Sequence, residues 1–134
     1  MGFGTVAFDT LQTSDSKNTG TSKTLDTSYI YNGSAKNWCS LVADTGTPIV
    51  EDSLNVSSLT DVGAGKHTIN ITNAMANDDY SLTMSTAKTG ARMVASAGAK
   101  ALITTTAYRV NTFATGSTEE DTGNISTVVM GQVT

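Results

Sequence analysis

Short stretches in which apolar and polar residues alternate with a period of two run along most of the chain. The alternation is clearest over residues 66–72, where His67, Ile69 and Ile71 share one face and polar residues occupy the other. Successive side chains of a strand point to opposite faces of a sheet, so this period predicts a strand with one buried face. We expect further strands over residues 4–8, 28–31, 37–43, 48–59, 80–85, 92–95, 101–113 and 125–132.

A hairpin is predicted where two of these segments meet. Residues 28–31 and 37–43 flank Asn32-Gly33, the dipeptide that most readily adopts the two positive φ angles of a type I′ turn. We therefore expect the two segments to pair as antiparallel strands.

Two longer segments are extended runs. Residues 48–59 begin at Pro48, the only proline, which is tolerated at a strand start because its missing N–H costs least there. Leu54 and Val56 fall on one inward face of this run. Residues 101–113 are rich in threonine and are expected as two strands or as one strand with a bend.

The number and length of these segments predict the fold class. Seven to nine short strands with frequent turns are typical of an all-β, antiparallel β-sandwich or a barrel-like knob. The stretch 9–27 is polar and has too little apolar mass to fold alone. We therefore expect an extended N-terminal arm or attachment segment over residues 1–28 and a β-sandwich knob domain over residues 29–134.

Composition adds an expectation of self-association. The chain has 134 residues, which suits one domain, and only 38% of them are hydrophobic, with three Phe, four Tyr and one Trp. Such a chain builds a thin core, so association with identical subunits is a plausible way to bury further apolar surface.

Charge and hydropathy exclude two classes of partner. The net charge is −4, and the eight Lys and Arg residues are spread along the chain, so no basic stripe is available to a nucleic acid. No segment has the roughly 20 apolar residues of a membrane span, and Met1 is not followed by a signal peptide. We expect a soluble protein with no membrane insertion.

Few residues are suited to chemistry. Cys39 is the only cysteine and lies in an apolar stretch, which indicates a buried, inert thiol and excludes an intrachain disulfide. His67 is the only histidine, and its place beside Ile69 favours a packing role. The acidic runs 78–79 and 119–121 lack the ligand spacing of a calcium loop and read as solvated charge. We expect no catalytic residues, no metal, no cofactor and no enzymatic activity.

Three other features of the sequence are explained without a binding or catalytic function. Gly63 and Gly65 lie between two strands and indicate a tight connection rather than a phosphate loop. Asn-x-Ser/Thr sequons occur by chance in such a chain, at Asn32, Asn55, Asn70 and Asn124. Aromatic side chains bind sugars when exposed, but inward neighbours favour a core position for each of Tyr29, Tyr31, Trp38, Tyr80 and Tyr108.

One part of the chain resembles a known family. Residues 29–38 read Tyr-Ile-Tyr-Asn-Gly-Ser-Ala-Lys-Asn-Trp, and residues 52–61 read Asp-Ser-Leu-Asn-Val-Ser-Ser-Leu-Thr-Asp. With residues 65–80 they resemble the C-terminal knob-type regions of phage tail fibres, and the similarity covers residues 29–86. The chain departs from that pattern at residues 39–41 and at His67, where packing rather than chemistry is affected.

The resemblance implies a virion structural protein with no catalytic residues. It implies a homotrimer of the short fibre or knob type, displayed on a particle assembled in the host bacterial cytoplasm, with other virion proteins bound through residues 1–28. One alternative is a capsid decoration or head-fibre protein, because no long shaft precedes the knob. Another is a tail adhesin that binds a host surface glycan through the loops 60–65, 75–79 and 114–124. A hydrolase would need paired carboxylates on a larger scaffold.

Overall fold

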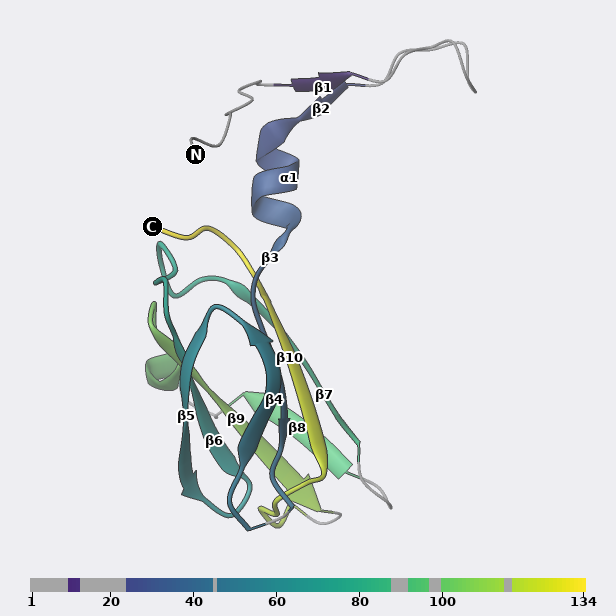
Figure 1. Ribbon diagram of the computed structural model, residues 1–134, viewed down its shortest axis with the longest axis vertical. Helices are drawn as coiled ribbons and strands as arrows, with labels where there is room; N and C mark the ends of the chain where they lie inside the picture. The colour runs from purple at the N-terminus through teal and green to yellow at the C-terminus, as the bar shows by residue number, and fades with distance from the viewer. Residues whose placement is uncertain (1–9, 13–23, 45, 88–91, 97–99, 115–116) are drawn as a thin grey trace, which may run out of the picture. The chain divides into compact units, whose positions relative to one another are not determined.

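The computed structural model describes residues 10–12, 24–44, 46–87, 92–96, 100–114 and 117–134. The chain divides into two compact units, Met1–Ser34 and Ala35–Thr134 (Figure 1). The boundary lies between Ser34 and Ala35, whereas the sequence placed it after residue 28. The strand expected over residues 4–8 lies outside the described residues.

The first unit is not simply an extended arm. It contains a two-stranded antiparallel ribbon of β1 (Thr10–Gln12) and β2 (Thr24–Asp26), followed by helix α1 (Thr27–Gly33). Asp26 is the N-cap of the helix, and its Oδ1 accepts a hydrogen bond from the Ser28 N–H at 2.7 Å.

The hairpin expected around Asn32-Gly33 is therefore wrong. Both residues belong to α1, and the segment 28–31 is helical. The segment 37–43 does form a strand, but its two edges are taken by other strands of the second unit. The turn propensity of Asn32-Gly33 is outweighed by two effects. Residues 27–33 form a capped helix, and the strand over residues 35–42 pairs with strands that are distant in the sequence.

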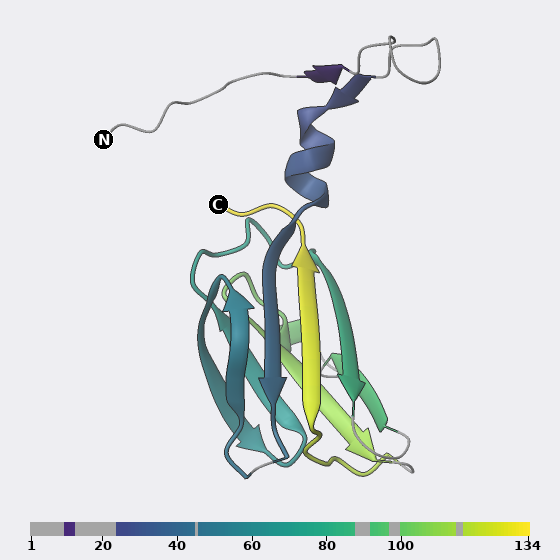
Figure 2. The ribbon, with the colours of Figure 1, turned by 45° about the vertical axis from the view of Figure 1, so that its right-hand side comes forward.

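The second unit is an antiparallel β-sandwich of two four-stranded sheets, which confirms the predicted fold class, and no closed barrel forms (Figures 1 and 2). The first sheet has the order β4-β3-β10-β7 and the second the order β5-β6-β9-β8. The bounds of the eight strands are β3 Ala35–Val42, β4 Ile49–Leu54, β5 Val56–Gly63, β6 Lys66–Ile71, β7 Ser81–Ala87, β8 Arg92–Ser96, β9 Ala107–Ala114 and β10 Asn124–Met130.

The last strand holds the first sheet together. β10 lies between β3 and β7 and pairs with both along its whole length (Figure 2). β9 has the same central place in the second sheet, between β6 and β8. Segments far apart in the sequence are therefore neighbours in each sheet.

Alternating side chains fill the space between the sheets. In β6 every second residue is buried, so the predicted shared face of His67, Ile69 and Ile71 is confirmed. Leu82 and Met84 of β7 pack against the same core, also as expected. The buried apolar residues are Cys39, Leu41, Ala43, Ile69, Ile71, Met75, Tyr108, Val110, Ile125 and Val129.

The run 48–59 is two strands rather than one. β4 ends at Leu54 and β5 begins at Val56 in the opposite sheet, so the chain changes sheets at Asn55. Asn55 has φ 59°, a left-handed conformation that Asn tolerates better than most residues. Leu54 and Val56 therefore do not share an inward face: Leu54 is exposed, and Val56 packs on the core.

The Asn55 side chain closes this corner. Its Nδ2 donates to the backbone oxygens of Lys36 and Asn73, each at 3.0 Å, and its Oδ1 accepts from the Asn73 N–H at 2.7 Å. Its own carbonyl accepts from Asn37 Nδ2 at 2.9 Å and from the Thr72 N–H at 3.1 Å. One residue thus connects three separate segments of the chain.

Two other segments differ in detail from expectation. The expected loop 60–65 is mostly strand, because β5 continues to Gly63 and turns through Ala64 and Gly65 into β6. Gly65 has φ 69°, and a Cβ there would lie 2.5 Å from the Thr112 oxygen, so only glycine fits. The run 101–113 holds one strand, β9, preceded by a 3-10 turn η1 (Lys100–Leu102).

Candidate functional site

The outer face of the first sheet carries a row of apolar side chains. Cys39 is buried between the sheets, so its neighbour Trp38 lies on the outer face of β3. Trp38 is paired with Leu54 of β4 on one side and with Val128 of β10 on the other. Leu54 is 47% exposed and Val128 37% exposed, while Trp38 is half-buried. We call Leu54, Trp38 and Val128 the outer row.

The apolar surface extends beyond the outer row in the direction of residue 35. Met130 of β10 is exposed on the same face as Val128 and is paired with Ala35, the first residue of β3. Beyond the outer row on the other side, a polar row runs across β4, β3 and β10 and consists of the paired residues Asp52, Ser40 and Ser126. With Met130, the apolar surface therefore reaches Ala35, the residue at which β3 begins.

The outer face of the second sheet has a different character. Asn70 Nδ2 donates to Ser58 Oγ at 2.9 Å and to Thr60 Oγ1 at 3.2 Å, and Arg109 Nε donates to Thr68 Oγ1 at 3.2 Å. These polar side chains satisfy one another at the solvent boundary. Met93 of β8 is also exposed on the second sheet, where it is paired with Phe113 of β9. The outer row joins apolar side chains of three neighbouring strands, so it is the apolar surface better suited to burial against another molecule.

A polar cluster lies in the middle of the sandwich. The Tyr108 hydroxyl from β9 donates to Asn37 Oδ1 of β3 at 2.8 Å and lies 2.7 Å from Thr127 Oγ1 of β10. All three residues are buried. Burial raises the pKa of Tyr108 well above its usual range, so the hydroxyl stays protonated and serves as a structural donor.

His67 is buried in the same interior. Its Nε2 lies 3.5 Å from Asp121 Oδ1, and neither ring nitrogen forms a hydrogen bond with the described residues. Burial lowers the pKa of His67, and the carboxylates of Asp121 and Asp61 oppose this effect. The Asp121 carboxylate instead accepts from the Gly65 N–H at 2.6 Å, which joins the loop 114–124 to the β5–β6 turn.

Cys39 is buried, and burial raises the pKa of its thiol to about 11. At neutral pH the group is therefore a thiol and not the nucleophilic thiolate. His67 is on the inner face of the other sheet, and neither of its ring nitrogens forms a hydrogen bond with Cys39. The structure does not assemble a Cys–His pair.

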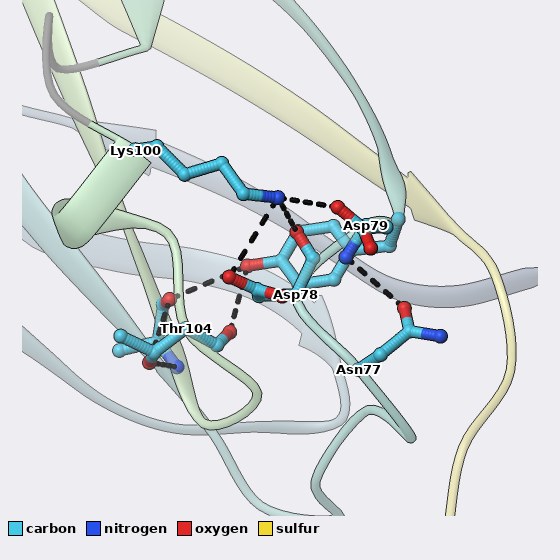
Figure 3. A network of polar contacts seen from close by, with 7 residues as sticks. Asn77, Asp78, Asp79, Lys100 and Thr104 are labelled. Atoms are coloured by element: carbon cyan, nitrogen blue, oxygen red, sulfur yellow. Dashed lines mark hydrogen bonds and ion pairs between the residues drawn. The ribbon is translucent and has the colours of Figure 1, made fainter.

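The acidic residues 78–79 form ion pairs. Lys100 Nζ lies 3.6 Å from Asp78 Oδ2 and is hydrogen-bonded to Asp79 Oδ1 and to the Asp78 backbone oxygen (Figure 3). Next to them the Tyr80 hydroxyl donates to the backbone oxygens of Thr104 at 3.0 Å and Ala107 at 3.3 Å. The cluster fastens the β6–β7 connection to the segment before β9.

The second acidic run is also tied to the fold. Glu119 forms an ion pair with Lys66 at 2.5 Å. Among the described residues, no group of three or more His, Cys, Asp and Glu side chains is placed to hold a metal ion. None of the described helices has the length and hydropathy that a membrane span requires.

The loops considered for glycan binding are divided between two regions. The β5–β6 turn meets the loop 114–124, because the Gly65 N–H donates to Asp121 Oδ1. The segment 75–79 instead contacts the C-terminal residues, since Met75 is bridged to Val133. In Figures 1 and 2 these two regions lie at opposite ends of the sandwich.

An open hollow of about 580 Å³ lies beside the Asn55 corner. Asn73, Thr72 and Val133 contribute to its wall, and among the described residues that line it Lys36 is the only charged one and none is aromatic. It offers no ring on which a sugar could stack and no pair of acids for hydrolysis.

The aromatic residues are distributed differently from the expected core positions. Tyr108 is buried and Tyr80 packs against the core, as expected. Tyr29 and Tyr31 are exposed because they belong to α1 rather than to a strand. Trp38 is on the outer face, a position that the alternation along β3 around Cys39 could have indicated.

Comparison with known proteins returns no similar protein: no family model matches the chain, and no curated protein or solved structure matches it significantly. A proposal for the function of the chain therefore depends on the arrangement of its own side chains.

Proposed function

We propose that this chain is a structural subunit of a bacteriophage particle that assembles with copies of itself and is displayed on the particle surface, without enzymatic activity. The observation that carries the proposal is the outer row, three uncharged apolar side chains aligned across neighbouring strands on the outer face of the first sheet. The resemblance of residues 29–86 to phage tail-fibre knobs supports the setting and favours a trimer. Residues 1–28 are the attachment segment in this proposal.

The outer row suits a second copy of the chain better than a charged partner. Leu54, Trp38 and Val128 form one line of uncharged side chains across three strands. Identical copies that meet on the outer row itself bring no like charges into direct contact, and Asp52, which is paired with Ser40, lies in the next row of the same face. Covering the outer row removes apolar surface from water, at about 25 cal/mol per Å².

The test compares two matched valines. Val128→Asp places a charge in the outer row, whereas Val62→Asp places it at an exposed valine of β5 in the other sheet. We expect light scattering to give an oligomeric mass for the wild type and for Val62→Asp, and a monomeric mass for Val128→Asp. A monomeric wild type at all concentrations would overturn the proposal.

The particle setting needs a separate measurement. We expect gold-labelled antibodies against the chain to bind intact particles in electron micrographs, and the position of the label distinguishes a tail fibre from a head fibre or capsid decoration. Particles that contain none of the protein by mass spectrometry would contradict the assignment. Binding of the purified protein to host cells would favour the adhesin alternative.

A further inference from the structure

We infer that the side chains of Lys66 and Asn111 join in an amide bond that links β6 to β9, with Glu119 as the acid and base of the reaction. The link lies within one copy of the chain, so it goes beyond the proposed self-association. Three features point to this bond: the pairing of the two residues, the Lys66–Glu119 ion pair, and the unpartnered amide oxygen of Asn111.

Lys66 and Asn111 are directly opposite each other on neighbouring antiparallel strands. The Thr112 N–H donates to the Gly65 oxygen at 2.8 Å, so the backbone hydrogen bond lies beside this pair and not within it. In such a pair the Cα atoms are only about 4.5 Å apart, and the side chains are closer than at the hydrogen-bonded positions of a ladder. A lysine side chain is long enough to span this separation and reach the amide carbon of the asparagine.

The amide of Asn111 is shielded from water and is not held by another group. Val110 and Thr112 are buried between the sheets, so Asn111 points to the outer face of the second sheet. Its partner on the other side is Ala95 of β8, which has no side-chain donor. Asn111 Oδ1 is buried and has no hydrogen-bond partner among the described residues. Exclusion of water favours attack on this amide by an amine over hydrolysis.

Glu119 is fixed beside the lysine. Its Oε2 lies 2.5 Å from Lys66 Nζ, and each of the two side chains is 35% exposed. Glu119 is bridged to Phe113, the next outward residue of β9 after Asn111. Backbone hydrogen bonds of 2.8 and 3.1 Å hold the segment 118–120 against residues 112–114. The amine, the amide and the carboxylate are therefore gathered at one end of the β6–β9 ladder.

The three groups are sufficient for the reaction. The Lys66 ammonium gives a proton to the Glu119 carboxylate, and the uncharged Nζ attacks Cγ of Asn111. The Cγ–Nζ bond forms, Glu119 passes its proton to Nδ2, and the Cγ–Nδ2 bond breaks. Nδ2 leaves as ammonia, which takes up the second proton lost by Nζ and becomes ammonium. No electron is transferred and no co-reactant is consumed.

The position of the bond explains its use to the fold. Lys66 and Asn111 form the last pair of the β6–β9 ladder, and the end of a ladder opens more readily than its middle. Cys39 is the only cysteine, so an intrachain disulfide cannot close this end. An amide bond fastens an inner strand of the second sheet by other means.

Intact-mass spectrometry of the denatured full chain tests the bond. We expect the wild type to have lost the mass of one ammonia relative to its sequence. In a tryptic digest, tandem mass spectrometry should find residues 37–88 joined to residues 110–134, because trypsin does not cleave after an acylated Lys66. Lys66→Arg keeps the positive charge but cannot form this amide, and we expect it to lose no ammonia. Equal mass deficits of the wild type and Lys66→Arg would overturn the inference.

A matched control separates another source of ammonia loss. Asn32-Gly33 also releases ammonia if the Asn32 side chain cyclises onto the backbone, and Asn32→Gln removes this route. We expect Asn32→Gln to keep the deficit and Glu119→Gln to lack it, with circular dichroism as the check that each variant is folded. A deficit that disappears in Asn32→Gln would overturn the bond, and one that persists in Glu119→Gln would overturn the role of the carboxylate.

Discussion

The Tyr108 hydroxyl joins the two sheets at a single buried point. It satisfies Asn37 Oδ1 and contacts Thr127 Oγ1, so the relative position of β9, β3 and β10 depends on one side chain. Such a cluster favours one packing of the sheets over others that are equally apolar, since every alternative leaves a buried polar atom unpaired.

Replacing this hydroxyl tests its contribution. Tyr108→Phe leaves Asn37 Oδ1 and Thr127 Oγ1 without the hydroxyl, and we expect the free energy of unfolding to fall by about 1–3 kcal/mol. Urea denaturation measures the change. Tyr29→Phe, at an exposed tyrosine of α1, serves as the control and should be close to neutral. An equal effect of both substitutions would contradict a role for the buried cluster.

His67 makes the stability of the sandwich depend on pH. Burial lowers its pKa in the folded protein, whereas the unfolded chain takes up the proton near pH 6.5. Below pH 6.5 the unfolded state therefore binds more protons than the folded state, and stability falls as the pH falls. The carboxylates of Asp121 and Asp61 limit the effect because they favour the charged ring.

Denaturation at several pH values checks this expectation. We expect the free energy of unfolding to decrease between about pH 6.5 and pH 5.5, by at most about 1.4 kcal/mol for each pH unit. His67→Gln should flatten the profile in this window. A wild-type profile as flat as that of the variant would show that the histidine does not couple folding to pH.

At the level of elements, the change of sheet at Asn55 depends on both backbone and side chain. Asn55→Ala loses the hydrogen bonds of the amide and places alanine at φ 59°. Asn55→Gly loses the same bonds but adopts this φ without strain. We expect both variants to be less stable in urea, and Asn55→Ala by about 1 kcal/mol more than Asn55→Gly.

The two outcomes of this comparison separate the causes. Equal losses would mean that the left-handed backbone carries no cost at this corner. If Asn55→Gly left the free energy of unfolding unchanged, the hydrogen bonds of the amide with Lys36 and Asn73 would contribute nothing to stability.

Much of the sandwich could be predicted from the period-two pattern. β6 and β7 follow it closely because each has one buried face, and β3 and β10 lie within one or two residues of their expected ranges. The pattern gave a wrong prediction where a single residue moves the chain from one sheet to the other. Asn55 sends the chain into the other sheet, and the alternation of residues 48–59 contains no sign of it.

The surface was harder to predict than the fold. Trp38 could be assigned to the outer face only after Cys39 was known to be inward. The pairing of Trp38 with Leu54 and Val128 depends on strand order, since these residues are up to 90 positions apart in the sequence. The helix at Thr27–Gly33 was missed because Asn32-Gly33 is also a strong turn signal.

For the whole molecule, the apolar character of the outer row predicts how assembly responds to salt. The chain has a net charge of −4, so copies repel one another weakly at low ionic strength. We expect the oligomeric mass from light scattering to persist or increase between about 0.05 and 0.5 M NaCl, because salt screens this repulsion. Dissociation at high salt would indicate that ion pairs hold the copies together.

During translation the two sheets cannot be completed at the same time. All four strands of the second sheet precede residue 115, whereas the first sheet lacks β10, one of its two inner strands, until residues 124–130 have left the ribosome. Until then the strand that pairs with both β3 and β7 is missing. The apolar inner face of the second sheet, which is complete by then, is therefore only partly covered by the first sheet. A nascent chain that stops before β10 is therefore expected to expose its core residues to the quality-control machinery of the cell.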